Sequence, residues 1–265
     1  MVVIGVVAVA IGRYFFGTMG AIFGLLIALG FQGFSLFAGH KIALSMARAR
    51  PLLSGEMPWY QQAAEQLSRK AGIPTPDLYL SPDPQPNAFA AGRSPSVAVV
   101  CVNQGLVDQM PRDQVIAVLA HEIGHIKNRD ILTMTVTAGM VTFISFLANI
   151  AWFIPRGDNE DRNPFVDLLM MILAPIGATI IQLAISRTRE FSADRTAAEL
   201  MGDARPMMGA LASLERGTTV TPSYTAQGST AHMYIASPFR GGGIMKLFST
   251  HPPIEDRIAA LRKTA

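Results

Sequence analysis

Three long runs without a charged residue constrain this chain more than any other feature of its sequence. Residues 14–39 form a run of 26, residues 131–155 a run of 25, and residues 168–186 a run of 19. A helix needs roughly 20 apolar residues to cross the hydrocarbon core of a bilayer. Each run is therefore predicted to be a membrane span. The alternative is a buried helix in a soluble core, but three such runs in a chain of 265 residues are hard to bury.

Residues 1–12 form a fourth and shorter apolar run, which ends before Arg13. We expect residues 1–39 to form a membrane hairpin of two spans, with the turn around residues 13–20. Twelve residues are short for a full crossing, so either this span tilts or thins the bilayer locally, or the sequence begins inside the original span. A cleaved signal peptide is disfavoured because there is no basic segment before the apolar run and no small-x-small site after it.

Basic residues near the ends of the predicted spans indicate their orientation. One side carries Lys41, Arg48, Arg50, Arg112, Lys127, Arg129, Arg187, Arg189 and Arg195. The other side carries Arg13, Arg156 and Arg162, of which the last two lie in an acidic loop. The positive-inside rule therefore places the first side in the cytoplasm.

This orientation divides the chain into a membrane part and a cytoplasmic part. Residues 131–155 and 164–186 are predicted spans, joined by a short non-cytoplasmic loop at 156–163. Residues 40–130 and 187–265 are expected to form the two halves of one cytoplasmic domain, which is large enough for its own core.

The composition excludes several other classes of protein. Half of the residues are hydrophobic and 15% are charged, whereas soluble domains average about 25% charged residues and disordered chains carry little apolar surface. The single cysteine, Cys101, excludes a disulfide framework and a multi-cysteine metal site, and its apolar surroundings predict a buried side chain. A net charge of +3 without a basic cluster gives no reason to expect nucleic-acid binding.

The cytoplasmic segments show both helical and strand patterns, so we predict an α+β domain. Helices are expected at residues 58–71, 111–130, 190–201 and 254–262, where prolines mark most of the starts. Strands are expected at residues 77–81, 87–90 and 96–102. Residues 217–243, rich in Gly, Ser, Thr and Pro, are expected to form a long loop.

The strongest chemical signal is His121-Glu122-Ile123-Gly124-His125. Residues four apart on a helix share one face, so the two imidazoles can reach a single metal ion. Glu122 is close enough to act on a water without binding the metal itself. A zinc ion polarises such a water and lowers its pKa toward 7, and the carboxylate accepts the proton. The alternative is a pair of surface histidines on an ordinary helix.

A catalytic zinc site needs a third protein ligand, and Glu190 is the best candidate. His125 lies shortly before the predicted span at 131–155, and Glu190 lies shortly after the span at 164–186. Because a short loop joins these spans, they are expected to be antiparallel neighbours whose cytoplasmic ends emerge together. Alternatively, Glu190 pairs with Arg187 or Arg189.

Three further sites are proposed from the residues. Asp194 lies on the same helical face as Glu190 and could accept a hydrogen bond from a ligand histidine, or it could pair with a basic neighbour such as Arg195. Asn87, Ala88 and Phe89 could pair with an extended substrate backbone, or form an ordinary strand end. His251 could stabilise an oxyanion, or could simply precede the last helix.

Taken together, these motifs resemble the HtpX family of bacterial membrane zinc metallopeptidases, which are related to the eukaryotic CAAX prenyl protease. The resemblance rests on His-Glu-Ile-Gly-His, Glu-Phe-Ser-Ala-Asp from Glu190, Asn-Ala-Phe-Ala from Asn87, Thr-His-Pro-Pro from Thr250, and the four predicted spans. It implies a zincin-type domain on a membrane anchor, with one Zn²⁺ per chain and Glu190 as the third ligand. It also implies quality control of misfolded or damaged membrane proteins at the cytoplasmic face of a bacterial inner membrane, where the lipid bilayer and other quality-control proteases would be partners.

Two other functions compete with this one. An intramembrane protease is disfavoured because Lys127, Arg129 and Asp130 directly follow the histidine motif, so its helix cannot itself span a membrane. A membrane scaffold or transport component with a structural metal is disfavoured because structural zinc sites use four protein ligands, whereas three candidates converge here.

Overall fold

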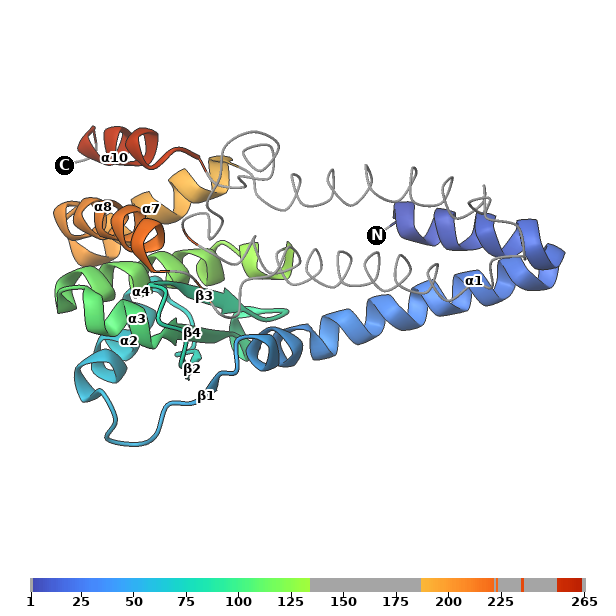
Figure 1. Cartoon of the computed structure of the whole chain (residues 1–265), viewed down its shortest axis with the longest axis horizontal. Helices are drawn as coiled ribbons and strands as arrows, with labels where there is room; N and C mark the ends of the chain where they lie inside the picture. Colours follow the sequence, from blue (N-terminus) through green and yellow to red (C-terminus); the bar gives the residue numbers. More distant parts are fainter. Residues whose placement is uncertain (1, 134–186, 222, 224–234, 236–251, 264–265) are drawn as a thin grey trace.

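The structure is a computed structural model, and it describes residues 2–133, 187–221, 223, 235 and 252–263 (Figure 1). Nearly all of the span predicted at 131–155, the whole span predicted at 164–186, and His251 lie outside the described residues. Most of the predicted loop at 217–243 lies outside them as well.

Helix α1 (Val2–Met46) forms an arm that extends away from the rest of the described chain (Figure 1). Its one residue with non-helical backbone angles is Gly17, at φ 62° and ψ −146°, and there the first part of the helix folds back along the second. A Cβ atom at Gly12 would collide with the backbone of Gly20, so this bend needs a glycine. Gly17 lies within the turn predicted at residues 13–20.

No single helix among the described residues is long and apolar enough to cross a membrane. One bent pair within α1, Gly17–Phe31 and Leu36–Met46, meets the criterion by length and composition, with a bend of 61° between its halves. The large apolar side chains exposed along this part of α1 include Phe23, Leu26 and Phe37.

A mixed four-stranded sheet forms the centre of the domain to which α1 is attached. Its strands are β1 (Arg50–Pro51), β2 (Asp77–Ser81), β3 (Ala88–Ala91) and β4 (Val99–Asn103), in the order β1-β2-β4-β3. β2 and β4 are parallel, while β1 and β3 pair antiparallel to their neighbours. β3 therefore lies at one edge of the sheet.

The two faces of the sheet are covered by different helices. On one face, Ala88, Ala90 and Val100 belong to the main core together with helices α2 (Pro58–Ala71) and α4 (Arg112–Lys127). On the other face, Phe89 and Cys101 pack with the C-terminal end of α1. The side chains of β3 alternate between the two faces, so α1 packs on one side of the sheet and the helix that carries the histidines packs on the other.

Helices α7 (Arg187–Met201) and α8 (Arg205–Val220) pack against the opposite side of α4, and α10 (Ile254–Arg262) packs on α7 and α8 (Figure 1). α4 packs most extensively against α7. A Cβ atom at Gly124 would lie only 3.3 Å from the Ala193 carbonyl oxygen and from Thr196 Cβ. Gly124 in the histidine motif therefore allows α7 to approach α4 closely.

The structure corrects the predicted elements at three places. Pro95–Val97 form a 3₁₀ turn, so the strand predicted at 96–102 begins at Val99 and extends to Asn103. Proline fixes φ and lacks an N–H, so the chain cannot enter the ladder at Pro95.

α8 continues to Val220, so the loop predicted from residue 217 begins later. β1, α8 and the short helix α3 (Gln104–Gln109) were not predicted. Cys101 is buried, as predicted.

Candidate metal centre and active site

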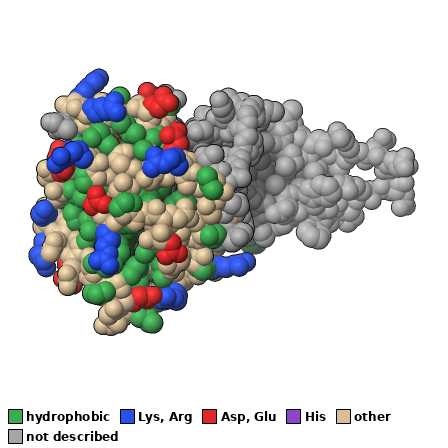
Figure 2. All heavy atoms as spheres, turned by 60° about the vertical axis from the view of Figure 1, so that its left-hand side comes forward, with side chains coloured by type: hydrophobic (Ala, Val, Ile, Leu, Met, Phe, Trp, Pro, Cys, Tyr) green, Lys and Arg blue, Asp and Glu red, His purple; other side chains and the backbone are tan. Residues whose placement is uncertain are grey.

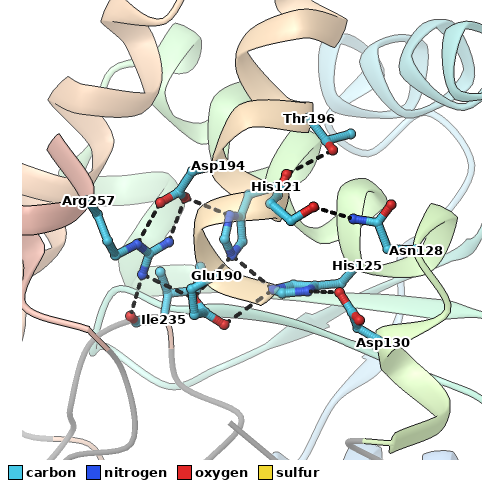
Figure 3. Close-up of polar contacts among 10 residues, drawn as sticks. His121, His125, Asn128, Asp130, Glu190, Asp194, Thr196, Ile235 and Arg257 are labelled. Carbon is cyan, nitrogen blue, oxygen red and sulfur yellow. Dashed lines mark hydrogen bonds and ion pairs between the residues drawn. The ribbon is translucent and has the colours of Figure 1, made fainter. Parts of the chain in front are cut away.

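His121 and His125 lie one turn apart on α4 and point into the same buried space (Figure 3). Their Nε2 atoms are 3.1 Å apart, and the exposed fractions of the residues are 1% and 2%. Among the described residues on the face shown in Figure 2, no histidine reaches the surface, which agrees with this burial. The pair is therefore not a pair of surface histidines.

Glu190, on α7, completes the group. Its Oε2 lies 3.7 Å from His121 Nε2, and its Oε1 lies 3.5 Å from His125 Nε2. His121, His125 and Glu190 offer three ligand atoms within 4.8 Å of one another, and all three residues are buried. The structure thus brings together the three ligands that the sequence predicts.

The spacing of these atoms fits a zinc ion. Zinc bonds of 2.0–2.1 Å in tetrahedral geometry place neighbouring ligand atoms about 3.3 Å apart. The separations between the two Nε2 atoms and between these atoms and the Glu190 oxygens are 3.1, 3.5 and 3.7 Å. Two imidazoles and one carboxylate are also a common ligand set of catalytic zinc, which leaves a fourth position open.

A carboxylate holds the far side of each imidazole (Figure 3). His121 Nδ1 lies 2.9 Å from Asp194 Oδ1, and His125 Nδ1 lies 3.0 Å from Asp130 Oδ2. An ionised carboxylate only accepts hydrogen bonds, so each Nδ1 carries the hydrogen and each Nε2 presents its lone pair to the metal position. The Asp194 contact is the one proposed from the sequence, whereas Asp130 was not considered as a partner.

Arg257, on α10, lies behind Asp194 and is fully buried. Its Nε donates to Asp194 Oδ2 at 2.8 Å and its Nη2 donates to Asp194 Oδ1 at 2.7 Å. Its Nη1 forms an ion pair with Glu190 Oε2 at 3.2 Å. Asp194 therefore contacts both His121 and a distant arginine, rather than pairing with Arg195 as in the alternative interpretation.

Glu122 lies beside the histidines and is 3% exposed. Burial raises the pKa of its carboxyl to about 7, and the nearby Glu190 carboxylate acts in the same direction, while His125 opposes the shift. A carboxyl with a pKa near neutrality can both accept and return a proton at physiological pH. Burial also lowers the pKa of His121, which favours the neutral ring that a metal binds.

The edge strand β3 packs against α4, and the nearby Ala90 backbone N–H lowers the pKa of Glu122 and so partly opposes the effect of burial. The Asn103 N–H donates to the Asn87 carbonyl at 2.9 Å, so residues 87 and 103 form a hydrogen-bonded pair. Because such pairs alternate along an antiparallel ladder, Phe89 also pairs with β4, whereas Ala88 and Ala90 turn their backbone groups away from it. The edge beside Glu122 thus presents Ala88 and Ala90.

Sequence reasoning missed Arg257, which left a signal in the sequence, and Asp130, whose position depends on the backbone conformation. Arg257 falls on the apolar stripe of Ile254, Ile258 and Leu261, where a charged residue is out of place unless it is paired in the interior. Asp130 follows His125 at the end of α4, where the left-handed Arg129, at φ 61°, redirects the chain. Of the other predicted residues, Asn87 lies directly before β3, and its Oδ1 accepts a hydrogen bond from the Ile235 N–H at 3.0 Å.

Comparison with known proteins identifies the family. The sequence profile described as Peptidase family M48 matches residues 54–265, most of the chain and all of the metal centre.

The chain belongs to peptidase family M48.

Three relatives, each named Protease HtpX homolog, extend this result over the whole chain. The protein of Salinibacter ruber is 44% identical over 267 residues, with 100% of this chain and 95% of the relative covered. The proteins of Aquifex aeolicus and Pyrococcus furiosus are 43% and 44% identical, with 97% of this chain and 88% and 91% of the relatives covered. The resemblance to the HtpX family is therefore confirmed, and this M48 chain is a metallopeptidase whose metal-binding group is His121, His125 and Glu190.

The fold of this M48 chain resembles a solved structure, described as the crystal structure of S. mikatae Ste24p. The TM-score is 0.53 at 20% sequence identity, and the match covers 97% of this chain and 61% of that one. At this level of identity the comparison speaks for the fold alone.

Proposed function

We propose that this metallopeptidase is a membrane-anchored zinc endopeptidase that cleaves misfolded or damaged membrane proteins at the cytoplasmic face of a bacterial inner membrane. The observation that carries the proposal is the convergence of two imidazole Nε2 atoms and one carboxylate beside a second buried carboxylate, Glu122. His121, His125 and Glu190 would hold one Zn²⁺ per chain.

Glu122 is assigned the proton transfers. A zinc ion bound at this site would polarise a water molecule and lower its pKa toward neutrality. The Glu122 carboxylate would accept a proton from the attacking water and later give it to the leaving amine. Its raised pKa, about 7, suits both directions of transfer.

The edge of β3 is proposed to bind the substrate backbone. An extended peptide can add to the edge strand of a sheet through main-chain hydrogen bonds. The alternation in the ladder favours Ala88 and Ala90 over Phe89 for these bonds, and β3 packs against α4, the helix that carries Glu122. A peptide bound there would pass directly over the catalytic carboxylate. Backbone recognition also suits a protease that must accept many unfolded sequences.

The membrane location is supported by α1 and by the charge pattern. α1 leads away from the domain and exposes large apolar side chains. Its C-terminal end packs on the sheet that contains β3. The cations at the predicted span ends favour a cytoplasmic active site. A damaged protein that emerges from the bilayer would reach the edge strand over a short path. Other quality-control proteases are proposed as partners in the same task.

The proposal is tested with the Glu122→Gln substitution in the full chain, purified in detergent. We expect this variant to retain one zinc per chain by elemental analysis but to lose cleavage of an unfolded membrane protein by at least about a hundredfold, the lower end of the range for general acid–base catalysis. Glu199→Gln, at an exposed position on the neighbouring helix α7, is the matched control and should cleave like the unmodified protein.

Cleavage by the Glu122→Gln variant at the rate of the unmodified chain would overturn the proposed mechanism. Equal cleavage of folded soluble proteins and unfolded membrane proteins by the unmodified chain would overturn the proposed substrate class while leaving the mechanism intact. Bound metal without cleavage of any substrate would favour the scaffold with a structural metal.

A further inference from the structure

Arg257 is a permanently charged side chain in the interior, and it does not belong to the metal-binding group. It lies on the C-terminal helix α10, its exposed fraction is 0%, and it is the largest fully buried side chain of the described residues. Moving a charge out of water costs several kcal/mol unless good pairing compensates for it. The partners of Arg257 should therefore explain how the fold compensates for the cost of burying its charge.

Those partners are two carboxylates on one face of α7. Asp194 receives two near-parallel hydrogen bonds, from Nε at 2.8 Å and from Nη2 at 2.7 Å. The remaining guanidinium nitrogen, Nη1, forms an ion pair with Glu190 Oε2 at 3.2 Å (Figure 3). The planar fork fixes the direction of the Asp194 carboxylate, and the guanidinium also balances the charge of Glu190.

Without this cation the two carboxylates would face each other uncompensated. Glu190 and Asp194 are four residues apart on a helix, and like charges at that spacing repel. Glu190 is a metal ligand, and Asp194 fixes His121, at 2.9 Å from its Nδ1. One guanidinium thus contacts one metal ligand directly and contacts another through the carboxylate of Asp194.

We propose that Arg257 is a positioning residue of the metal centre, and that through its contacts with Asp194 and Glu190 it makes metal affinity depend on the docking of the C-terminal helix α10. This inference rests on the metal-dependent function proposed above. α4 and α7 then supply the ligands, while α10 supplies the group that keeps two of them in place. Arg257 itself contacts neither substrate nor metal in this role.

Arg257 also connects the metal centre to the start of the substrate edge. Its Nη1 donates to the Ile235 carbonyl at 3.2 Å, and the Ile235 N–H donates to Asn87 Oδ1 at 3.0 Å. Asn87 directly precedes β3. The same guanidinium therefore contacts the ligand carboxylate and the residue that holds Asn87, so both sides of the active site depend on one side chain.

The test compares Arg257→Lys with Arg262→Lys, a matched change at an exposed position of the same helix. Zinc affinity is measured on the full chain in detergent by competition with a chelator, and the visible absorption of the Co²⁺-loaded protein reports the ligand geometry. Lysine keeps the charge but cannot form the fork, so we expect zinc affinity to fall about 10- to 100-fold and the Co²⁺ spectrum to change. Arg262→Lys should change neither.

A second variant tests whether Arg257 acts through Asp194. If it does, Asp194→Asn combined with Arg257→Lys should weaken zinc binding much less than the product of the two single effects, because both changes break the same contact. If the effects of the two substitutions on zinc affinity multiplied, Arg257 would not act through Asp194.

Wild-type zinc affinity and an unchanged Co²⁺ spectrum in Arg257→Lys would overturn the inference. So would a lowered unfolding temperature with unchanged affinity, which would show a purely structural role. Both measurements are independent of proteolysis, so a failure of the proposed peptidase function would be recognised separately, by cleavage assays on the unmodified chain.

Discussion

The two metal-binding histidines differ in how the fold supports them, although they lie on the same helix. His125 is held by Asp130, five residues further along the chain, at 3.0 Å. His121 is held by Asp194 from α7, and Asp194 is held in turn by Arg257 from α10. The support of His125 is local, whereas that of His121 requires three helices to assemble.

This difference predicts which half of the site is more sensitive to substitution. Among the described residues, the side chain of Asp194 is 2% exposed and contacts His121 and Arg257 on two other helices, while that of Asp130 is 10% exposed and contacts His125. A buried group with several partners leaves more unsatisfied polar atoms behind when it is changed. The His121 half should therefore respond more strongly.

The largest effect is expected for Asp194→Asn. The amide leaves the buried Arg257 without its main counter-charge, and breaking a buried ion pair costs about 3–5 kcal/mol. We predict a loss of about 3 kcal/mol in the free energy of unfolding, measured with denaturant in the presence of a chelator, and weaker zinc binding. Asp203→Asn, which removes an exposed partner of Arg205, is the control and should change stability by less than about 1 kcal/mol. Equal losses for the two variants would remove the distinction between them.

A smaller effect is expected for Asp130→Asn. The amide oxygen can still accept the hydrogen bond from His125 Nδ1, so the loss is that of charge assistance, about 1 kcal/mol of folding stability. Zinc affinity should fall by about tenfold, the lower end of the range for groups that orient a ligand. If Asp130→Asn destabilised the fold as much as Asp194→Asn, the contact of His125 with Asp130 would matter as much as that of His121 with Asp194. The proposed difference between the two histidines would then be wrong.

The same distinction explains how far the site could be predicted from the sequence. His121, Glu122 and His125 follow from a spacing within one helix. Glu190 follows from topology, because two predicted neighbouring spans carry it toward the histidines. Arg257 could not be placed in the same way, since its partners depend on how α10 docks on α7, and no local pattern reports that docking.

The secondary structure could be predicted from the sequence only to a similar extent. The elements with clear boundary residues were predicted closely, such as α2, which starts at Pro58 and stops at the left-handed Gly72. β1 has only two residues, and it is defined by its pairing with β2 rather than by its own sequence. The strand predicted from residue 96 starts later because Pro95 directs the chain into a 3₁₀ turn. Pairing and docking are properties of the assembled chain, and they account for most of what was missed.

The smallest effect is expected where a carboxylate is paired but exposed. Glu56 pairs with Arg50 at 2.6 Å beside β1, and the hydrogen bond from Arg50 lowers its pKa from 4.5 to about 2. A lowered pKa means that the contact stabilises the fold above pH 4.5 and that this contribution is lost as the pH falls toward about 2. Solvent screens such a pair, so Glu56→Gln should lower the unfolding temperature only slightly at pH 7, and the difference should shrink between pH 4.5 and 3. Zinc affinity should stay unchanged, because Glu56 is not part of the metal centre. A large or pH-independent loss of stability would show that exposure does not separate this carboxylate from Asp130 and Asp194.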